Sequence, residues 1–325
     1  MSPLTGSLAR AGGGWLVTML RSLLLVAACA APAVAVDAEP LKMVQVAPGV
    51  YVQFGLQEDW LPGNAGNIAN IGFVVGERCV AVIDTGGTPE IGRRLRESIA
   101  RTTPLPVCYV INTHMHPDHV LGNEAFVQQG GGPQFVASSK LPQALAAREP
   151  YITNSLHRDF KLPLGHEAFV YPGITVEQTL DLDLGGRSLH LQAWPTAHTD
   201  NDLTVLDTQT KAMYFGDLLF VGHLPVVDGS LKGWVALEPE LRRLDVAVVI
   251  PGHGPSSTDW PAALAAQQAY LEALLRETRA SIKSRMTIQQ AVDTVGRDAV
   301  RRWLLVDEFH KRNVTAAYAE LEWED

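Results

Sequence analysis

The segment with the clearest chemical potential in this sequence spans positions 113 to 119 and reads Thr-His-Met-His-Pro-Asp-His. His114 and His116 are two residues apart, so both side chains can face one point if the backbone is extended. The proline after them bends the chain, which allows Asp118 and His119 to face a second point nearby. Because imidazole and carboxylate groups suit zinc at neutral pH, the pattern predicts a metal site. The alternative is a solvated polar turn, but histidines this dense rarely arise without a ligand.

Three later positions carry further metal-capable side chains, each in a loop just after a predicted strand. They are His198, Asp217 and His253. Loops at strand ends of a layered α/β fold are where sites normally form. A lone histidine or aspartate is more often a hydrogen-bonded surface residue, but in this order behind the first cluster the three predict one shared site.

This constellation resembles the metallo-β-lactamase superfamily, whose His-x-His-x-Asp-His motif matches His114, His116, Asp118 and His119. The likeness covers about residues 44–256. It implies an α/β fold built as a four-layer αβ/βα sandwich, with the metals at one edge. The resemblance further implies the following ligand set: His114, His116 and His198 for the first zinc, Asp118, His119 and His253 for the second, and Asp217 as the bridge.

The resemblance also implies a chemistry. Two zinc ions, with manganese or iron as alternatives, lower the pKa of bound water towards about 7, so that metal-bound hydroxide is available as a nucleophile. Asp118 would orient this hydroxide and could shuttle a proton. Asp84, in the matching Ile-Asp-Thr-Gly stretch at 83–86, would orient a ligand imidazole. We therefore expect a hydrolase of a small ester, thioester, lactone or amide.

Two other functions stay open from the sequence. The β-lactam-hydrolysing enzymes with a cysteine ligand would need cysteine where Asp217 stands, so β-lactam hydrolysis is an alternative rather than the expectation. A non-catalytic metal-binding accessory protein is another, because ligands alone do not prove catalysis. Within the superfamily, the stretches 116–123 and 197–202 resemble the periplasmic quinoprotein relay system zinc metallohydrolases. That likeness implies a functional link to a quinoprotein dehydrogenase or a sulfur-oxidation pathway.

The first 35 residues are predicted to be an export signal to the periplasm. The apolar run Leu23–Ala30 is too short to span a bilayer, and Ala33-Val34-Ala35 forms a cleavage site. A lipobox ending at Cys29 is an alternative that would leave a lipid anchor. Cleavage removes two arginines and no acid, which takes the formal charge from −9 to −11. With no basic run of five or more, nucleic acid is not an expected partner, and a small molecule is.

The remaining 290 residues are predicted to form a single domain over 36–325, with a core at about 44–256 and a helical extension at about 257–325. Buried runs at 79–84 and 107–112 flank a helical pattern at 89–101, which favours parallel strands. Other strands are expected at 44–55, 67–76, 180–184, 188–194, 203–207, 212–215 and 246–250. After position 259 helices are expected at 260–284, 287–295 and 298–306.

Two cysteines remain after the signal. Cys79 lies five residues before Asp84 and Cys108 five before Thr113, where the two buried strands end. If these parallel strands are neighbours, the cysteines lie at one level and within disulfide range. We predict a Cys79–Cys108 disulfide, which suits an oxidising compartment, and two buried thiols are the alternative.

A few further residues carry weaker signals. His223 follows Asp217 by six positions and is a candidate for the substrate pocket. The stretches 60–67 and 220–234 are expected to be the loops that select the substrate. Asn313-Val314-Thr315 matches the glycosylation pattern, although in a protein with a bacterial-type signal the match is expected to have no meaning.

Overall fold

The computed structural model describes residues 39–128 and 130–324. The predicted export signal, its cleavage site and the lipid-anchor position Cys29 lie outside these residues. Within the described part of the chain, no helix is long and apolar enough to cross a membrane.

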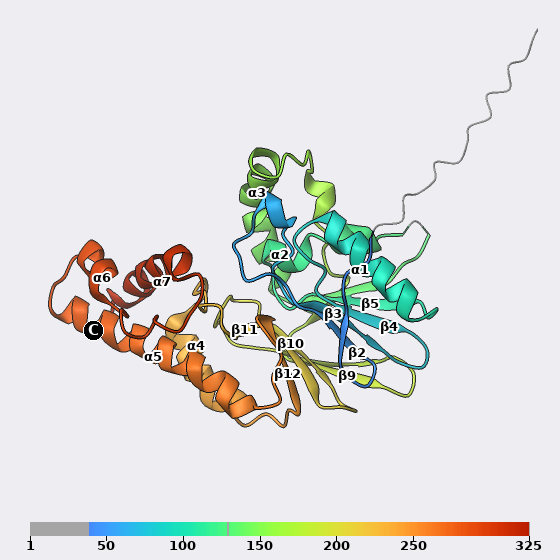
Figure 1. Cartoon of the computed structure of the whole chain (residues 1–325). Coiled ribbons are helices and arrows are strands. Elements are labelled where there is room, and N and C mark those ends of the chain that lie inside the picture. The colour runs from blue at the N-terminus through green and yellow to red at the C-terminus, as the bar shows by residue number, and fades with distance from the viewer. Residues whose placement is uncertain (1–38, 129, 325) are drawn as a thin grey trace, which may run out of the picture. The chain divides into compact units, whose positions relative to one another are not determined.

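Twelve strands form two sheets in this part of the chain (Figure 1). The first sheet has the order β1-β2-β3-β4-β5-β6-β7, antiparallel from β1 to β4 and parallel from β4 to β7. Its strands are β1 (Val44–Ala47), β2 (Val50–Gln53), β3 (Ile71–Val75), β4 (Val80–Ile83), β5 (Val107–Ile111), β6 (Gln134–Ser138) and β7 (Ile174–Val176). The second sheet has the order β12-β11-β10-β9-β8, with only β11 and β12 parallel. Its strands are β8 (Thr179–Asp183), β9 (Ser188–Ala193), β10 (Leu203–Asp207), β11 (Ala212–Phe220) and β12 (Val248–His253).

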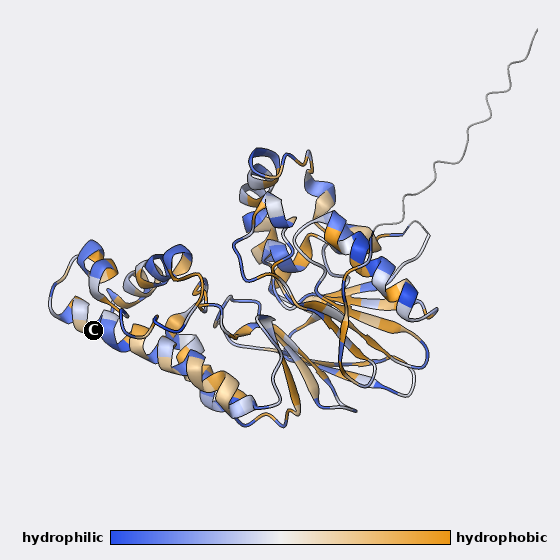
Figure 2. Cartoon of the chain, in the orientation of Figure 1, coloured by the Kyte–Doolittle hydropathy of each residue, from blue (hydrophilic) through white to orange (hydrophobic). Residues whose placement is uncertain are grey.

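The two sheets pack face to face, and helices cover their outer faces (Figure 1). One apolar cluster joins side chains of both sheets, for example Ile83 and Ile111 with Leu191 and Val205. The helices are α1 (Pro89–Thr102), α2 (Pro117–Val120), α3 (Leu141–Arg158), α4 (Leu231–Leu241), α5 (Trp260–Lys283), α6 (Ile288–Thr294) and α7 (Val306–Leu321), with short 3-10 turns at Pro62–Asn64, Asn123–Phe126 and His166–Ala168. Figure 2 shows strands that are largely hydrophobic and helices that mix both kinds of residue, as each helix buries one face. The predicted four-layer αβ/βα sandwich with a C-terminal helical extension is confirmed.

Several strand predictions differ from the structure; the strand expected at 246–250, for example, spans Val248–His253. The stretch 44–55 is a hairpin, not one strand, because the chain turns at Pro48 and at Gly49, whose φ is 72°. Glycine adopts this left-handed conformation at no steric cost. The strand expected at 212–215 continues to Phe220, and all nine of its residues are buried.

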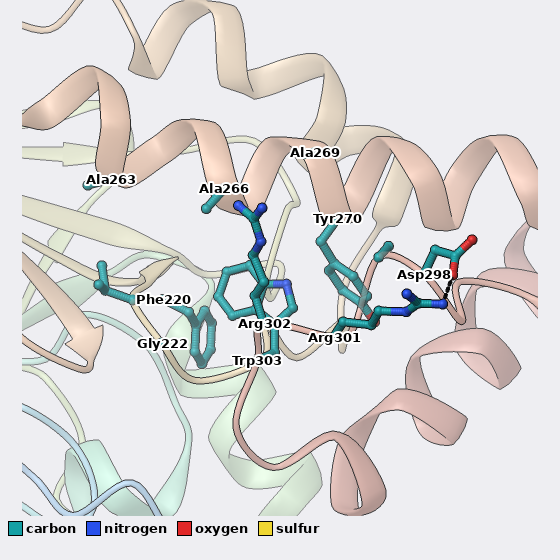
Figure 3. A pocket seen from close by; sticks show the side chains of 12 residues that line it. Phe220, Gly222, Ala263, Ala266, Ala269, Tyr270, Asp298, Arg301, Arg302 and Trp303 are labelled. Carbon is teal, nitrogen blue, oxygen red and sulfur yellow. Dashed lines mark ion pairs between the residues drawn. The ribbon is translucent and has the colours of Figure 1, made fainter.

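One helix prediction and one loop prediction also need correction. No helix spans 298–306: the segment turns, and α7 begins at Val306 after Leu305, whose φ is 60°. The stretch 220–234 is only partly a loop, because α4 begins at Leu231, where Ser230 caps the helix by accepting from Gly233 N at 2.9 Å. Residues of the 298–306 segment instead line a cavity of about 490 Å³ beside α5. The aromatic side chains of Phe220, Tyr270 and Trp303 line this cavity (Figure 3).

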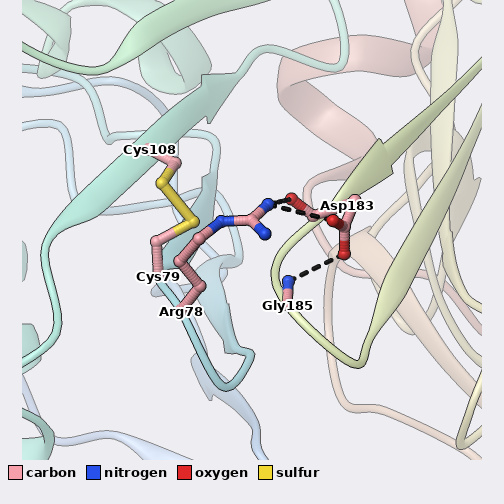
Figure 4. Close-up of a disulfide and its surroundings, with 5 residues drawn as sticks. All are labelled: Arg78, Cys79, Cys108, Asp183 and Gly185. Atoms are coloured by element: carbon pink, nitrogen blue, oxygen red, sulfur yellow. Dashed lines mark hydrogen bonds and ion pairs between the residues drawn. A yellow bond between two sulfur atoms is a disulfide. The ribbon is translucent and has the colours of Figure 1, made fainter.

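A disulfide joins Cys79 and Cys108, with their Cα atoms 5.7 Å apart (Figure 4). β4 and β5 are parallel neighbours with Val80 opposite Val107, so Cys79, just before Val80, and Cys108, just after Val107, lie diagonally across the strand pair and not directly opposite each other as expected. Arg78 beside it donates to the Asp183 carboxylate at 3.0 Å and so links this end of the first sheet to the second.

Candidate metal centre

All seven predicted metal-binding side chains lie together at one edge of the sandwich. Four follow the end of β5, one lies in the turn between β9 and β10, one in β11 and one at the end of β12; in that order they are His114, His116, Asp118, His119, His198, Asp217 and His253. Six of them are buried, and the side chain of His116 is 19% exposed. Because strand ends of both sheets meet here, loops far apart in sequence supply a single site.

Asp217 reaches this edge through an irregular part of β11. The register between β11 and β12 shifts on both sides of Gly216, whose φ of 52° favours glycine. A Cβ atom at Gly252 in β12 would overlap Asp217 Oδ1. The ladder irregularity and the missing side chain together make room for a carboxylate inside the sandwich.

The first group of candidate ligands comprises His114, His116, His198 and Asp217. His116 Nδ1 lies 3.0 Å from His114 Nε2 and 3.0 Å from His198 Nε2. Asp217 Oδ2 lies 3.4 Å from His198 Nε2 and 3.8 Å from His114 Nε2. One cation could therefore contact three nitrogens and one oxygen.

The second group comprises Asp118, His119 and His253. Asp118 Oδ2 lies 3.3 Å from His253 Nε2 and 3.5 Å from His119 Nε2. Asp217 is also close to this group, with Oδ1 3.3 Å from His119 Nε2 and Oδ2 3.5 Å from His253 Nε2. Asp217 thus faces both groups, which is the position of a bridging ligand.

Hydrogen bonds on the far side of each imidazole fix which nitrogen faces the centre. His119 Nδ1 lies 2.8 Å from Asp84 Oδ2, and a carboxylate only accepts, so Nδ1 carries the proton. Asp84 Oδ2 also accepts from Thr113 Oγ1 at 2.7 Å, and this leaves the Thr113 oxygen free to accept from His114 Nδ1 at 3.1 Å. Asp84 thus orients two of the ligands, one directly and one through Thr113.

The other three imidazoles are held in the same way. His198 Nδ1 donates to the Val226 carbonyl at 2.7 Å, and His253 Nδ1 donates to the Ile68 carbonyl at 3.0 Å. His116 Nε2 donates to Asp228 Oδ2 at 3.0 Å. All five histidines therefore direct their other ring nitrogen into the centre.

This arrangement fits metal cations. Three imidazole lone pairs at 3.0 Å spacing have no proton between them, and a cation is the group that would satisfy them. His119 Nε2 and Asp217 Oδ1 are buried and lack a hydrogen-bond partner among the described residues, although such atoms are normally paired. Nitrogen and carboxylate oxygen are also the donors that zinc accepts.

The charges of the two groups differ. Burial lowers the pKa of His114 well below its usual value and that of His198 to about 4, so both are neutral near pH 7. Burial opposes a charge on His253 as well, but Asp217 and Asp118 outweigh it and raise the pKa of His253 to about 9. The same carboxylates raise the pKa of His119. Protons thus balance the carboxylates of the second group when no cation is bound.

Asp228 and Arg148 are site residues that the sequence did not reveal. Arg148 in α3 donates to both oxygens of Asp228, at 2.8 and 2.7 Å, while Asp228 accepts from His116. Burial opposes the charge of Asp228, but His116 and Arg148 hold its pKa well below the usual range. Neither residue belongs to a motif, and only their meeting in space gives them this role.

A pocket of about 190 Å³ opens onto the centre. Its lining includes five of the candidate ligands: His116, Asp118, His198, Asp217 and His253. Apolar side chains line another part, among them Trp60, Met115, Tyr151, Ile152, Val226, Val227 and Phe309, and charged side chains complete it: Asp59, Arg148, Asp228 and Arg312. The predicted pocket residue His223 lies there, with its ring 4.9 Å from that of His253. Arg312 lines the same pocket and lies over the Phe309 ring at 5.4 Å.

The polar residues after His198 shape its turn. Asp202 accepts from Thr199 N and Oγ1, and burial raises the pKa of Asp202 to about 8. Asn201 is buried and donates to Asp200. These residues form the turn and are not among the candidate ligands.

The comparisons with known proteins agree with this geometry. The family model of the metallo-beta-lactamase superfamily matches residues 65–253. Among curated proteins, a linear primary-alkylsulfatase from a Pseudomonas species is 24% identical over 207 residues, which are 53% of this chain and 39% of that protein.

Solved structures show the same fold. The sec-alkylsulfatase Pisa1 from Pseudomonas sp. superposes with a TM-score of 0.67 and 18% identity, covering 87% of this chain and 51% of that one. A metallo-beta-lactamase from Pontibacter korlensis superposes with a TM-score of 0.56 and 21% identity, covering 71% of this chain and 99% of that one. The chain spans about half or less of the length of these alkylsulfatases.

Proposed function

The chain belongs to the metallo-beta-lactamase superfamily and is a hydrolase of that fold, and we propose that it uses two divalent cations, with zinc as the expected metal, to cleave an ester-type bond in a small molecule. The observation that carries the proposal is the pair of adjacent ligand groups whose imidazole nitrogens all face one centre. His114, His116 and His198 would hold one cation and Asp118, His119 and His253 the other, with Asp217 between them. When bound, such a pair supplies an activated water at neutral pH and polarises the scissile group.

The residues of the chain would do the rest. Asp118 lines the pocket as well as facing the second group, so it can accept a hydrogen bond from the attacking water and orient it. Burial opposes its charge, but His119 and His253 hold the pKa of Asp118 at about 2, which keeps it an acceptor. Asp84 and Asp228 keep the imidazoles in their metal-facing orientation.

The pocket supports a substrate with an apolar part. Part of its lining is aromatic and aliphatic, and its volume suits a small molecule or one end of a longer one. Carboxylic esters, thioesters, lactones and amides meet this description.

A sulfate ester is a second candidate, and the sequence reasoning did not include it. The alkylsulfatase relatives act, by their names, on alkyl sulfates. Arg312 supports this candidate because it lines the pocket and makes no ion pair with the described residues, so it could receive an anionic group. β-Lactam hydrolysis has weaker support, since the similar β-lactamase structures share the fold alone.

We also propose a setting for this activity. The N-terminal pattern supports export to the periplasm, and the stretches 116–123 and 197–202 support kinship with the quinoprotein relay metallohydrolases. In that setting the protein would act beside a quinoprotein dehydrogenase or a sulfur-oxidation pathway.

The test is a panel of carboxylic esters, thioesters, lactones, β-lactams, phosphodiesters and alkyl sulfates, assayed with the zinc-loaded protein. We expect about two zinc ions per chain and turnover of one ester class, lost in Asp118→Ala. Asp245→Ala is the matched control, because the Asp245 carboxylate is 88% exposed and lies outside both ligand groups. Failure to bind zinc would refute the proposal, whereas full loading without turnover across the panel would favour an accessory protein.

A further inference from the structure

A short segment between β11 and α4 touches two ligands of the first group. We call residues 225 to 228 the support loop. Its Val226 carbonyl accepts from His198 Nδ1 at 2.7 Å, and its Asp228 carboxylate accepts from His116 Nε2 at 3.0 Å. The backbone N–H of Asp228 also donates to the His198 carbonyl at 3.2 Å. Any shift of this loop therefore moves the partners of His116 and His198 together.

The support loop is held from behind by Asn313 of α7. Asn313 is fully buried; its Oδ1 accepts from Val227 N at 3.0 Å, and its Nδ2 donates to the Pro225 carbonyl at 2.6 Å. The same Nδ2 donates to the Tyr270 hydroxyl of α5 at 2.9 Å. Both N–H groups and the oxygen of the Asn313 amide are thus used in hydrogen bonds that join the support loop to the C-terminal helices.

The position of Asn313 argues against glycosylation at the Asn313-Val314-Thr315 pattern. Glycosylation needs an accessible asparagine amide, but here the amide is buried and fully hydrogen-bonded. The asparagine is explained by its contacts with the support loop.

The second ligand group has different supports. His119 is held by Asp84, which follows β4, and His253 by the Ile68 carbonyl, which precedes β3. Neither contact involves α7 or the support loop. Of the hydrogen bonds named above, those of the support loop reach only His116 and His198, whereas Asp84 serves both groups, His119 directly and His114 through Thr113.

We propose that Asn313 is a positioning residue for the first ligand group, acting through the support loop on His116 and His198. The C-terminal helical extension is then part of the metal centre and not an appendage to it. This inference rests on the metal binding in the proposed function, and the experiment below separates the two.

Asn313→Ala removes both hydrogen bonds to the loop and leaves the Val227 N–H and the Pro225 carbonyl unpaired. Loss of a group that orients a metal-ligating side chain typically weakens metal binding by about 10- to 100-fold. Asn313 acts one contact further out, so we expect the lower end of that range, about tenfold, for the first group. The second group should change by less than about twofold, since none of its supports is altered.

The measurement is zinc affinity by competition with a chromophoric chelator, on the full chain. The effect is measured in two backgrounds: His253→Ala, which weakens the second group, and His116→Ala, which weakens the first. Asn313→Ala should lower zinc affinity about tenfold in the His253→Ala background and leave it nearly unchanged in the His116→Ala background. Val314→Ala is the matched control, because Val314 is equally buried in the same helix and its apolar side chain cannot form a hydrogen bond with the support loop.

The outcomes are distinct. Equal losses in both backgrounds, or the same loss in Val314→Ala, would overturn the inference and leave the proposed function intact. A wild-type chain that binds no zinc would instead refute the proposed function. If Asn313→Ala does not fold, Tyr270→Phe gives the same test, since it removes one hydrogen bond to Asn313 and should cost about threefold in the His253→Ala background only. No loss there would overturn the inference as well.

Discussion

Replacing Asp84 with asparagine exchanges one oxygen for a nitrogen at the point where His119 is held. The backbone tolerates this change, because Asp84 has a φ of 53° and asparagine adopts that conformation readily. The remaining amide oxygen can still accept from Thr113 N, as Asp84 Oδ1 does at 2.8 Å. The new amide nitrogen, however, takes the place of Oδ2, which accepts from His119 Nδ1 and from Thr113 Oγ1, so it faces two donors.

The size of the effect follows from this contact. His119 loses a hydrogen bond to a charged acceptor at 2.8 Å, and such bonds contribute about 1.5–3 kcal/mol. At 1.36 kcal/mol for each factor of ten, zinc should bind the second group roughly 10- to 150-fold more weakly. The alternative tautomer of His119 would remove this conflict, but it places the proton on Nε2, the atom that faces the metal, so zinc binding would be weakened in that tautomer as well.

The assay is a zinc titration of Asp84→Asn against a competing chelator. The zinc of the second group should bind more weakly by the stated factor, and the zinc of the first group by a smaller factor, because Asp84 reaches His114 only through Thr113. Asp207→Asn serves as the control for general loss of stability, because Asp207 is equally buried but pairs with Arg187 away from the centre. Unfolding midpoints of both variants, measured without zinc, show how far stability alone accounts for any change.

Two results would refute the reasoning. One is wild-type affinity for both zinc equivalents in Asp84→Asn. The other is the same loss in Asp207→Asn, which would show that zinc binding follows overall stability and not the orientation of His119.

Three further predictions concern protons and stability. Zinc binding at pH 7.5 should release about two protons, from His119 and His253, because their pKa values are raised in the metal-free protein. Zinc affinity should therefore rise with pH up to about 9. Calorimetry in buffers of different ionisation enthalpy measures the proton release, and the absence of any release would contradict the assignment. Burial, with Glu272 nearby, raises the pKa of Glu238 to about 8, so the folded state keeps a proton that the unfolded chain gives up above about 4.5. Stability should fall between these pH values by at most about 1.4 kcal/mol for each pH unit, and Glu238→Gln should flatten this slope in urea unfolding at pH 5 and pH 8. The Cys79–Cys108 disulfide closes a loop over a separation of 29 residues, which corresponds to about 3.6 kcal/mol of chain entropy. Reduction of the disulfide should therefore lower the free energy of unfolding by roughly that amount. An unchanged urea unfolding midpoint after reduction would contradict this prediction.

Much of the fold could be predicted because its signals are local. The buried runs that became β4 and β5 and the cap and spacing of α1 depend on residues close in the chain. Local patterns failed where packing decides, as at 298–306, where apolar residues suited a helix but the chain turns against α5. The turn at Pro48-Gly49 was missed because the strands on both sides have the same composition.

The candidate ligands were also readable from the sequence. His114 and His116 lie in one short motif, and His198, Asp217 and His253 come in the order expected from the resemblance, although Asp217 lies inside β11 and His253 ends β12 where loops were expected. Metal coordination needs particular side chains at strand ends, and both features leave a mark in a linear sequence.

The supports of those ligands could be decided only by the tertiary structure. Asp228 lies 112 residues from the His116 that it holds, and Asn313 lies 86 residues from the Val227 N–H that it accepts from. A hydrogen bond that orients a ligand demands one acceptor atom within about 3 Å, and many residue types on many loops could provide it. The sequence by itself therefore determined which side chains could bind metal, whereas the packing of α3 and α7 around the sandwich decided which residues keep them in place.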